Sequence, residues 1–213
     1  MPDRPIIGII GGTGDLGSGL ARAWTAAGYE VVVGSRTRDK AEAFAAELGG
    51  LAKGNDNIGA AAAADVVVLA VPFASHEATL EGIKPALQGK ILVDAAVPLV
   101  PPKVSVVQLP EGGSAAQIAQ RLLGDGVRVV SAFHNVGASK LHAGGRADCD
   151  VLVFSDDKEA RDIVIELAGV VANRGIAGGV LANSAAAEAL TSVLIWINRN
   201  YKVSGAGIAI TGL

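Results

Sequence analysis

The residues best suited to chemistry in this chain are three glycines near its start. Gly12, Gly14 and Gly17 have the spacing G-x-G-x-x-G, after an apolar run at 6–10 and before a helical pattern at 16–27. In this spacing the first glycine allows a tight turn, the second lets the backbone approach a pyrophosphate, and the third lets the helix pack on the strand. The N–H groups of a helix N-terminus also attract phosphate. The stretch therefore predicts a dinucleotide-binding turn.

The end of the second expected strand, residues 30–34, indicates which dinucleotide is bound. An NAD site has an acidic residue here to accept hydrogen bonds from the ribose 2′-OH, but this chain has Ser35 and Arg36, with Lys40 four residues later. A hydroxyl and a cation bind a 2′-phosphate, which a carboxylate would repel. We therefore predict NADP. The alternative is that Arg36, Arg38 and Lys40 only form the solvated start of a helix.

Two further strand ends carry side chains that would reach the coenzyme crevice of such a fold. The buried strand expected at 65–72 is followed by Phe73, which would pack either on the nicotinamide or in the core. The strand expected at 127–132 runs into His134, for which a structural and a substrate-binding role are both open. His76 has no recognisable partner, and we expect it on the surface at a helix start.

The elements that position these residues alternate between buried strands and helices, which is typical of an α/β fold with a Rossmann-type, doubly wound, mostly parallel sheet. The expected strands are at 6–10, 30–34, 51–53, 65–72, 90–96, 127–132, 150–155 and 170–172. The expected helices are at 16–27, 39–48, 57–63, 114–123, 157–168 and 183–198. A loop with four prolines spans 98–110 and is expected to border the site.

We expect two parts in this chain. Residues 1–155 would form the NADP-binding Rossmann domain, and residues 156–213 a small C-terminal, partly helical extension. The helix at 183–198 is apolar on nearly all sides, so it requires cover from a core or from a second subunit.

The composition limits the possible functions. Half of the 213 residues are hydrophobic and 18% are charged, which suggests surface buried between subunits. A net charge of −3 does not favour nucleic-acid binding. The single cysteine, Cys149, excludes an internal disulfide and fits a reducing compartment. With no membrane-length apolar run and no secretory leader, we expect a cytoplasmic protein without membrane partners.

No proton donor is recognisable beside the expected crevice. Hydride reduction of a carbonyl or an imine usually requires one. The two tyrosines, Tyr29 and Tyr201, are not placed in a Tyr-x-x-x-Lys pattern, no His and Asp have the spacing of a lactate-type dehydrogenase, and no Cys/His cluster suggests zinc. A flavin or deazaflavin acceptor removes this requirement, because hydride then passes from ring to ring. We expect no catalytic acid or base and no metal.

The chain resembles the F420-dependent NADP reductases over nearly its whole length. The motifs that carry this resemblance are G-G-T-G-D-L-G at 11–17, V-V-V-G-S-R at 31–36 with Lys40, A-V-P-F-A-S-H at 70–76, V-P at 97–98, V-S-A-F-H-N at 130–135 and L-A-N-S at 181–184. The resemblance implies a homodimer that holds NADP(H) and the 5-deazaflavin coenzyme F420 with their rings stacked, and that moves a hydride directly between them.

The resemblance also implies roles for individual residues. Those of the glycine turn would contact the pyrophosphate: Thr13, Gly14, Asp15 and Leu16. Three would hold the 2′-phosphate: Ser35, Arg36 and Lys40. Three would line the nicotinamide end: Phe73, where the family also has tryptophan, Val97 and Ala138. His134 would face the deazaflavin. Three cations are candidates for the acidic tail of F420: Lys103, Lys140 and Arg146.

Two other function classes stay open. An NADPH-dependent reductase of a small imine or carbonyl, such as a pyrroline-carboxylate reductase, shares the strand pattern at 64–72. Such enzymes carry a large helical domain where this chain has only about thirty residues after Ala182. The other class is a non-catalytic NADP(H) sensor, or a relative of the cytosolic domain of membrane metalloreductases. The lack of a membrane span weakens the metalloreductase version.

Overall fold

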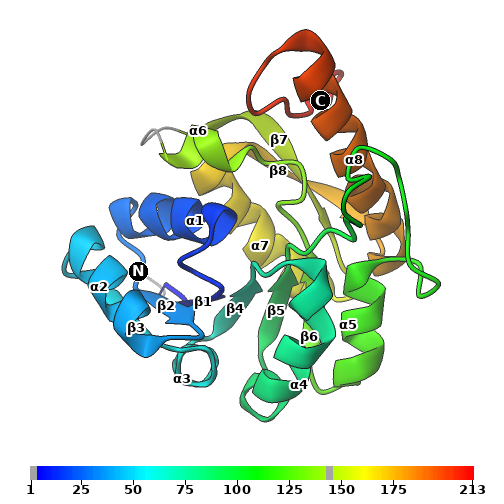
Figure 1. Ribbon diagram of the computed structural model, residues 1–213. Coiled ribbons are helices and arrows are strands. Elements are labelled where there is room, and N and C mark those ends of the chain that lie inside the picture. Colours follow the sequence, from blue (N-terminus) through cyan, green and yellow to red (C-terminus); the bar gives the residue numbers. More distant parts are fainter. Residues whose placement is uncertain (1–3, 143–145) are drawn as a thin grey trace.

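The computed structural model describes residues 4–142 and 146–213 (Figure 1). Within these ranges, eight strands form one sheet in the order β3-β2-β1-β4-β5-β6-β7-β8. The strands are β1 (Ile7–Ile10), β2 (Val31–Ser35), β3 (Ala52–Asp56), β4 (Val66–Leu69), β5 (Ile91–Asp94), β6 (Arg128–Ser131), β7 (Ala147–Phe154) and β8 (Ala172–Gly179). The α-helices are α1 (Asp15–Ala26), α2 (Arg38–Leu48), α3 (Asn57–Ala63), α4 (His76–Leu87), α5 (Ala115–Leu123), α6 (Ala138–His142), α7 (Lys158–Val171) and α8 (Ser184–Tyr201). Two 3₁₀ turns lie at Phe73–Ser75 and Leu181–Asn183.

Helices cover both faces of the sheet (Figure 1), and a hydrophobic core lies between the sheet and the helices on each face. On one face, Trp24 of α1 and Leu167 of α7 pack on Ile9. On the other, helices α3, α4 and α5 pack on Ile10 and Leu92. Because neighbouring residues of a strand point to opposite faces, both must be apolar when both faces are covered. The expected doubly wound α/β sheet is confirmed.

The pairing is parallel from β3 through β6. Strand β7 is antiparallel to β6 and meets it at one pair, Ser131 and Phe154. Strand β8 then continues parallel to β7. The expectation of a mostly parallel sheet is therefore confirmed, and the carboxyl ends of β1, β2, β4, β5 and β6 share one edge.

The sheet extends further than its sequence pattern indicated at both edges. Helix α7 continues to Val171, where we expected a short strand, and β8 follows with the sequence A-N-R-G-I-A-G-G. This strand has no apolar alternation. A Cβ at Gly175 would lie 2.5 Å from the Ile165 carbonyl oxygen of α7, so glycine there allows the helix to approach closely. At the other edge, Gly54 lets β3 approach α2 in the same way.

Helix α8 packs on the rest of the chain along one side only. Leu194 is 6% exposed, whereas Val193 is 41% and Trp196 51% exposed. The proline-containing loop lies beside this helix (Figure 1), and Arg199 donates to the Ser105 hydroxyl over 3.5 Å. None of the helices in the described ranges has the length and hydropathy that crossing a bilayer requires.

Candidate functional site

The glycine turn joins β1 to α1 in a conformation that requires glycine for several distinct reasons. The left-handed residue is Gly11, with φ of 78°, so the tight turn that we assigned to Gly12 is made one residue earlier. Gly12 is needed for space, because its Cβ would lie 2.9 Å from the Ile9 carbonyl oxygen. At Gly17 a Cβ would lie 2.5 Å from the Gly11 carbonyl oxygen, so this glycine lets α1 start against the turn.

The N-terminus of α1 is open toward the turn. Gly14 is its N-cap and offers no side-chain acceptor, so the first N–H groups of the helix stay available to an anion. Asp15 and Leu16 are the first two helical residues. The Thr13 hydroxyl is exposed and lies 3.5 Å from the Ser35 hydroxyl at the end of β2. The turn and the end of β2 thus present polar groups to the same space.

A cavity of about 270 Å³ opens at this point. Its lining comes from the glycine turn, the start of α2, the end of β4 and the start of α4. Residues predicted to bind NADP gather in it: Thr13, Gly14, Ser35, Arg36 and Lys40. The structure therefore brings together residues that are up to 27 positions apart in the sequence.

The three cations after β2 separate into two groups. The Arg38 Nε donates to the Glu42 Oε1 over 2.7 Å, so Arg38 belongs to the outer surface of α2. Arg36 and Lys40 line the cavity and take part in no ion pair formed within residues 4–142 and 146–213. Arg38 therefore fits the alternative of a solvated helix start. Arg36 and Lys40 are in a position to attract an anion.

A second cavity, of about 610 Å³, adjoins the first and shares Ser35 and Arg36 with it. It extends over α3 and α4, where Ile58 is 58% exposed and Ile83 forms part of the lining. An apolar surface beside a guanidinium is suited to the face of a flat heterocycle. Ile58 was not among the predicted site residues, although an isoleucine in an Ala- and Gly-rich helix was the available signal.

Residues expected at the nicotinamide end follow the carboxyl ends of three adjacent strands. Phe73 follows β4, Val97 follows β5, and His134 and Ala138 follow β6. Phe73, Val97 and Ala138 are half-buried. In an open α/β sheet this edge is where ligands bind, so the fold positions these residues in the crevice region.

His134 is held as a neutral imidazole. It is 6% exposed, and its Nε2 lies 3.3 Å from the Ser131 hydroxyl. Burial lowers the pKa of His134 to about 4, although the nearby Asp94 opposes this shift. The preceding residue, Phe133, has φ of 69°, which is rare for a bulky side chain, and packs edge-to-face on Trp24 at 5.7 Å.

Helix α8 fixes the backbone on either side of this imidazole. The Thr191 hydroxyl donates to the His134 carbonyl oxygen over 3.0 Å. The Asn135 Nδ2 donates to the Ala187 carbonyl oxygen, also over 3.0 Å. The segment after β6 is therefore positioned by the C-terminal helix as well as by the sheet.

His76 is fully buried, so our expectation of a surface position is wrong. Its Nε2 lies 2.6 Å from the Oδ2 of Asp94, the last residue of β5. His76 shares the buried side of α4 with Leu80, Ile83 and Leu87, and this helical spacing was a signal in the sequence. The second sequence signal was Asp94, an acidic residue at the end of the otherwise apolar strand I-L-V-D.

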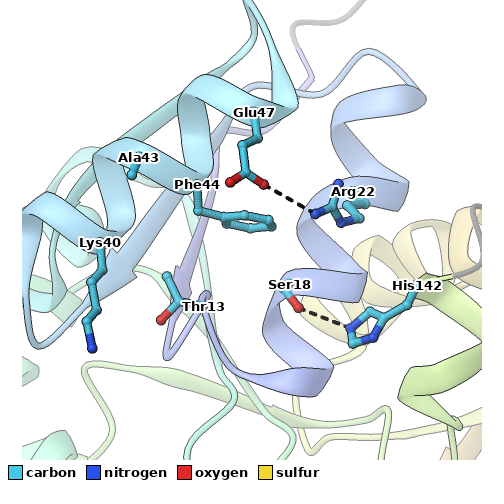
Figure 2. Close-up of a pocket in the computed structure, with 8 residues that line it drawn as sticks. All are labelled: Thr13, Ser18, Arg22, Lys40, Ala43, Phe44, Glu47 and His142. Atoms are coloured by element: carbon cyan, nitrogen blue, oxygen red, sulfur yellow. Dashed lines mark hydrogen bonds and ion pairs between the residues drawn. The ribbon is translucent and has the colours of Figure 1, made fainter.

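A third cavity, of about 530 Å³, lies between α1 and α2 and shares Thr13 and Lys40 with the first (Figure 2). Figure 2 shows His142 directed at Ser18, whose Oγ lies 3.1 Å from the His142 Nε2. The same nitrogen lies 2.8 Å from the Asp15 carbonyl oxygen. These contacts attach the end of α6 to the start of α1.

The cations considered for an acidic tail differ in their surroundings. Lys103 and Lys140 are exposed. The guanidinium of Arg146 donates to the carbonyl oxygens of Gly169 and Ala172 at the end of α7. Within the described ranges, no group of three or more His, Cys, Asp or Glu residues is arranged to hold a metal ion.

The fold and this crevice define a dinucleotide-binding protein of the Rossmann class. A family model described as NADP oxidoreductase, coenzyme F420-dependent, matches residues 6–98. The F420-dependent NADP reductases of Methanothermobacter marburgensis and Methanocaldococcus jannaschii are 40% and 38% identical to this chain, over 97% of it and 98% of each relative. The chain therefore belongs to the family of F420-dependent NADP reductases, as its motifs indicated.

Solved structures agree with this assignment. A candidate F420-dependent NADP reductase from Arthrobacter sp. FB24 superposes with a TM-score of 0.80 at 26% identity, over 97% of this chain and 99% of that one. A pyrroline-5-carboxylate reductase from Coxiella burnetii has a TM-score of 0.67 at 22% identity and shows the fold alone.

Among relatives by sequence, the Metalloreductase STEAP3 of Rattus norvegicus is 31% identical, but this chain covers only 36% of it.

Proposed function

We propose that this protein transfers a hydride directly between NADP(H) and coenzyme F420. The observation that carries the proposal is the cavity in which Thr13, Ser35, Arg36 and Lys40 meet beside the open N-terminus of α1. It occurs in a chain whose relatives, matched over nearly their full length, are F420-dependent NADP reductases.

The residues present fit NADP(H). The turn would hold the pyrophosphate through the free N–H groups of α1, because Gly14 has no side chain to cover them and Gly17 lets the helix start against the turn. Arg36 and Lys40 would hold the 2′-phosphate as charge-assisted donors, with Ser35 adding a hydroxyl. The cavity lined by Ile58 would take the adenine, since it offers an apolar face next to the Arg36 guanidinium.

The residues after β4, β5 and β6 would hold the two reacting rings. When bound, NADPH supplies a hydride and oxidised F420 accepts it. Phe73, Val97 and Ala138 would fix the nicotinamide, and the neutral imidazole of His134 would face the deazaflavin. Orientation of two reactants contributes up to roughly 7–11 kcal/mol in well-aligned systems, so these residues act by alignment and by excluding water.

A homodimer and a cytoplasmic location are part of the proposal. The exposed side of α8, with Val193, Trp196 and Tyr201, and the neighbouring loop, with Val106, form an apolar surface that a second copy would bury. The lone cysteine, Cys149, fits a reducing compartment. Residues 156–213 would then contribute both the interface and the support of the F420 side.

One assay tests the reaction. Purified protein is mixed with NADPH and oxidised F420, and the loss of deazaflavin absorbance is followed, with NADH as a control. We expect rapid bleaching with NADPH and little with NADH. If active coenzyme is not bleached while NADPH is consumed with a cyclic imine, the imine reductase alternative holds instead.

A further inference from the structure

Three ionisable side chains form a buried cluster behind the expected nicotinamide end. His76 and Asp94 are 0% exposed and Glu188 is 1% exposed. They come from the start of α4, the end of β5 and the first half of α8. Burying charged groups is costly unless they are paired. The alignment of the two rings uses none of these three residues, so the cluster requires an explanation of its own.

Short contacts hold His76 to Asp94 and Glu188 to α5, and the charges of Glu188 and Asp94 act on one another. Besides its 2.6 Å contact with His76, Asp94 accepts a hydrogen bond from the Ala96 N–H over 3.0 Å. The two carboxylate oxygens of Glu188 accept from the N–H groups of Ala115 over 2.7 Å and Ala116 over 3.3 Å. Glu188 therefore binds the first residues of α5, and α8 contributes the second carboxylate of the cluster.

The cluster touches Phe73, which is expected beside the nicotinamide, and binds the residue that precedes Val97. The ring centroids of Phe73 and His76 are 5.8 Å apart, with planes tilted by 31°. Ala96, which donates to Asp94, directly precedes Val97. Because the cluster is buried, its field is screened far less than that of a surface charge. A net charge on it would therefore be felt in the adjoining crevice.

Ionisation of Glu188 adds a negative charge to the cluster near neutral pH. Burial opposes protonation of His76, but the hydrogen bond and charge of Asp94 outweigh it and raise the pKa of His76. When protonated, His76 offsets one carboxylate. Burial raises the pKa of Glu188 to about 7, with bonds from α5 opposing the shift, so a second carboxylate ionises there. His134 stays neutral, and the carboxylate of Glu77, which also faces His76 from α4, is exposed and screened.

The N-terminus of α5 offsets about half a unit charge, because the helix dipole places that fraction at its start. Protonation of Glu188 would remove one negative charge from the cluster. Deprotonation adds one negative charge without adding a counterion. The cluster can therefore change the charge next to the crevice without any change in the residues that contact the coenzyme.

We infer that the cluster of His76, Asp94 and Glu188 favours the oxidised, cationic nicotinamide, so that the site binds NADP⁺ relative to NADPH more tightly than it would without Glu188. The inference rests on the proposed function. NADP⁺ and NADPH have the same adenosine and phosphates, and the nicotinamide ring is positive only in NADP⁺. A negative charge behind the ring stabilises that form and favours hydride leaving NADPH.

The test measures a ratio of dissociation constants without F420. NADPH is titrated by its fluorescence and NADP⁺ by competition, in the wild type, in Glu188→Gln and in Glu77→Gln. Titration of the 2′-phosphate affects both nucleotides alike, so it cancels in the ratio of the Kd of NADP⁺ to the Kd of NADPH. At about pH 8, Glu188→Gln is expected to raise this ratio roughly threefold to tenfold, and the exposed control less than twofold.

The wild type also provides a test that requires no variant. Its ratio is expected to fall as the pH rises from about 6 to about 8, because Glu188 ionises in this range, and to stay level in Glu188→Gln. A level ratio in the wild type, or a pH dependence that persists in Glu188→Gln, would overturn the inference. If the wild type binds neither nucleotide, the proposed function is what fails.

Discussion

The hydroxyl of Thr13 in the glycine turn lies 3.5 Å from the hydroxyl of Ser35 at the end of β2. This contact joins two predicted parts of one coenzyme site, the pyrophosphate turn and the 2′-phosphate cluster. Both side chains line one cavity with Arg36 and Lys40. Because they share this cavity, the contribution of each can be measured on the same ligand.

Replacing Arg36 by alanine is expected to weaken NADPH binding by about 1.5–3 kcal/mol, the range for hydrogen bonds to charged groups. Binding of NADH, which lacks the 2′-phosphate, should barely change. Arg38→Ala is the matched control, because Arg38 pairs with Glu42 on the outer surface of α2. Titration calorimetry with both nucleotides measures the effect. Equal losses for NADPH and NADH would show that Arg36 has a structural role only.

Gly17→Ala is expected to lower both the melting temperature and the affinity for NADPH. The new methyl group would lie 2.5 Å from the Gly11 carbonyl oxygen, so the helix must move away from the turn. At Gly169 in α7 a Cβ meets nothing within 4 Å, and Gly169→Ala should stabilise the protein by about 0.4–1 kcal/mol. Thermal melts with and without NADPH separate these effects. An unchanged affinity in Gly17→Ala would contradict the assigned close approach.

Trp196→Glu is expected to convert a dimer into a monomer, because Trp196 is 51% exposed on the apolar side of α8. Leu194→Glu should instead reduce stability, since Leu194 is buried within its own chain. Ala46→Glu adds the same charge at an exposed position of α2, away from α8, and serves as the control. Light scattering after size exclusion reports the mass. A wild type that is monomeric at assay concentration would disprove the proposed interface.

Acid should destabilise the protein through His134. Burial lowers its pKa from 6.5 to about 4 in the folded chain, so the unfolded chain binds more protons between these values. Neutral His134 makes its full contribution to the free energy of unfolding above about pH 6.5. That free energy then falls by up to about 3 kcal/mol as the pH decreases to 4. Urea unfolding of the wild type and His134→Gln should therefore show a smaller acid loss in the variant.

The sequence by itself determined the seven strands from β1 to β7, most of the helices, the glycine turn and the preference for NADP, but α4 and α6 were not among the expected helices. These features depend on residues close together in the chain. Ser35 and Arg36 follow β2 directly, and the spacing of Gly12, Gly14 and Gly17 is contained in six residues. Local apolar patterns also specify buried parallel strands, because both of their faces must be apolar.

Only the tertiary structure decided what lies behind the crevice. The contacts of His76 with Asp94, and of Glu188 with α5, join residues that are distant in sequence and come from different elements. The bounds of strand β8 were predicted wrongly, at 170–172 instead of Ala172–Gly179, because its glycines pack closely against α7 and the strand has no apolar alternation. Long-range packing determines which polar side chains become buried together, and local sequence patterns do not indicate these pairs. The same packing gives Glu188 its shifted pKa and leaves the side of α8 that carries Trp196 uncovered.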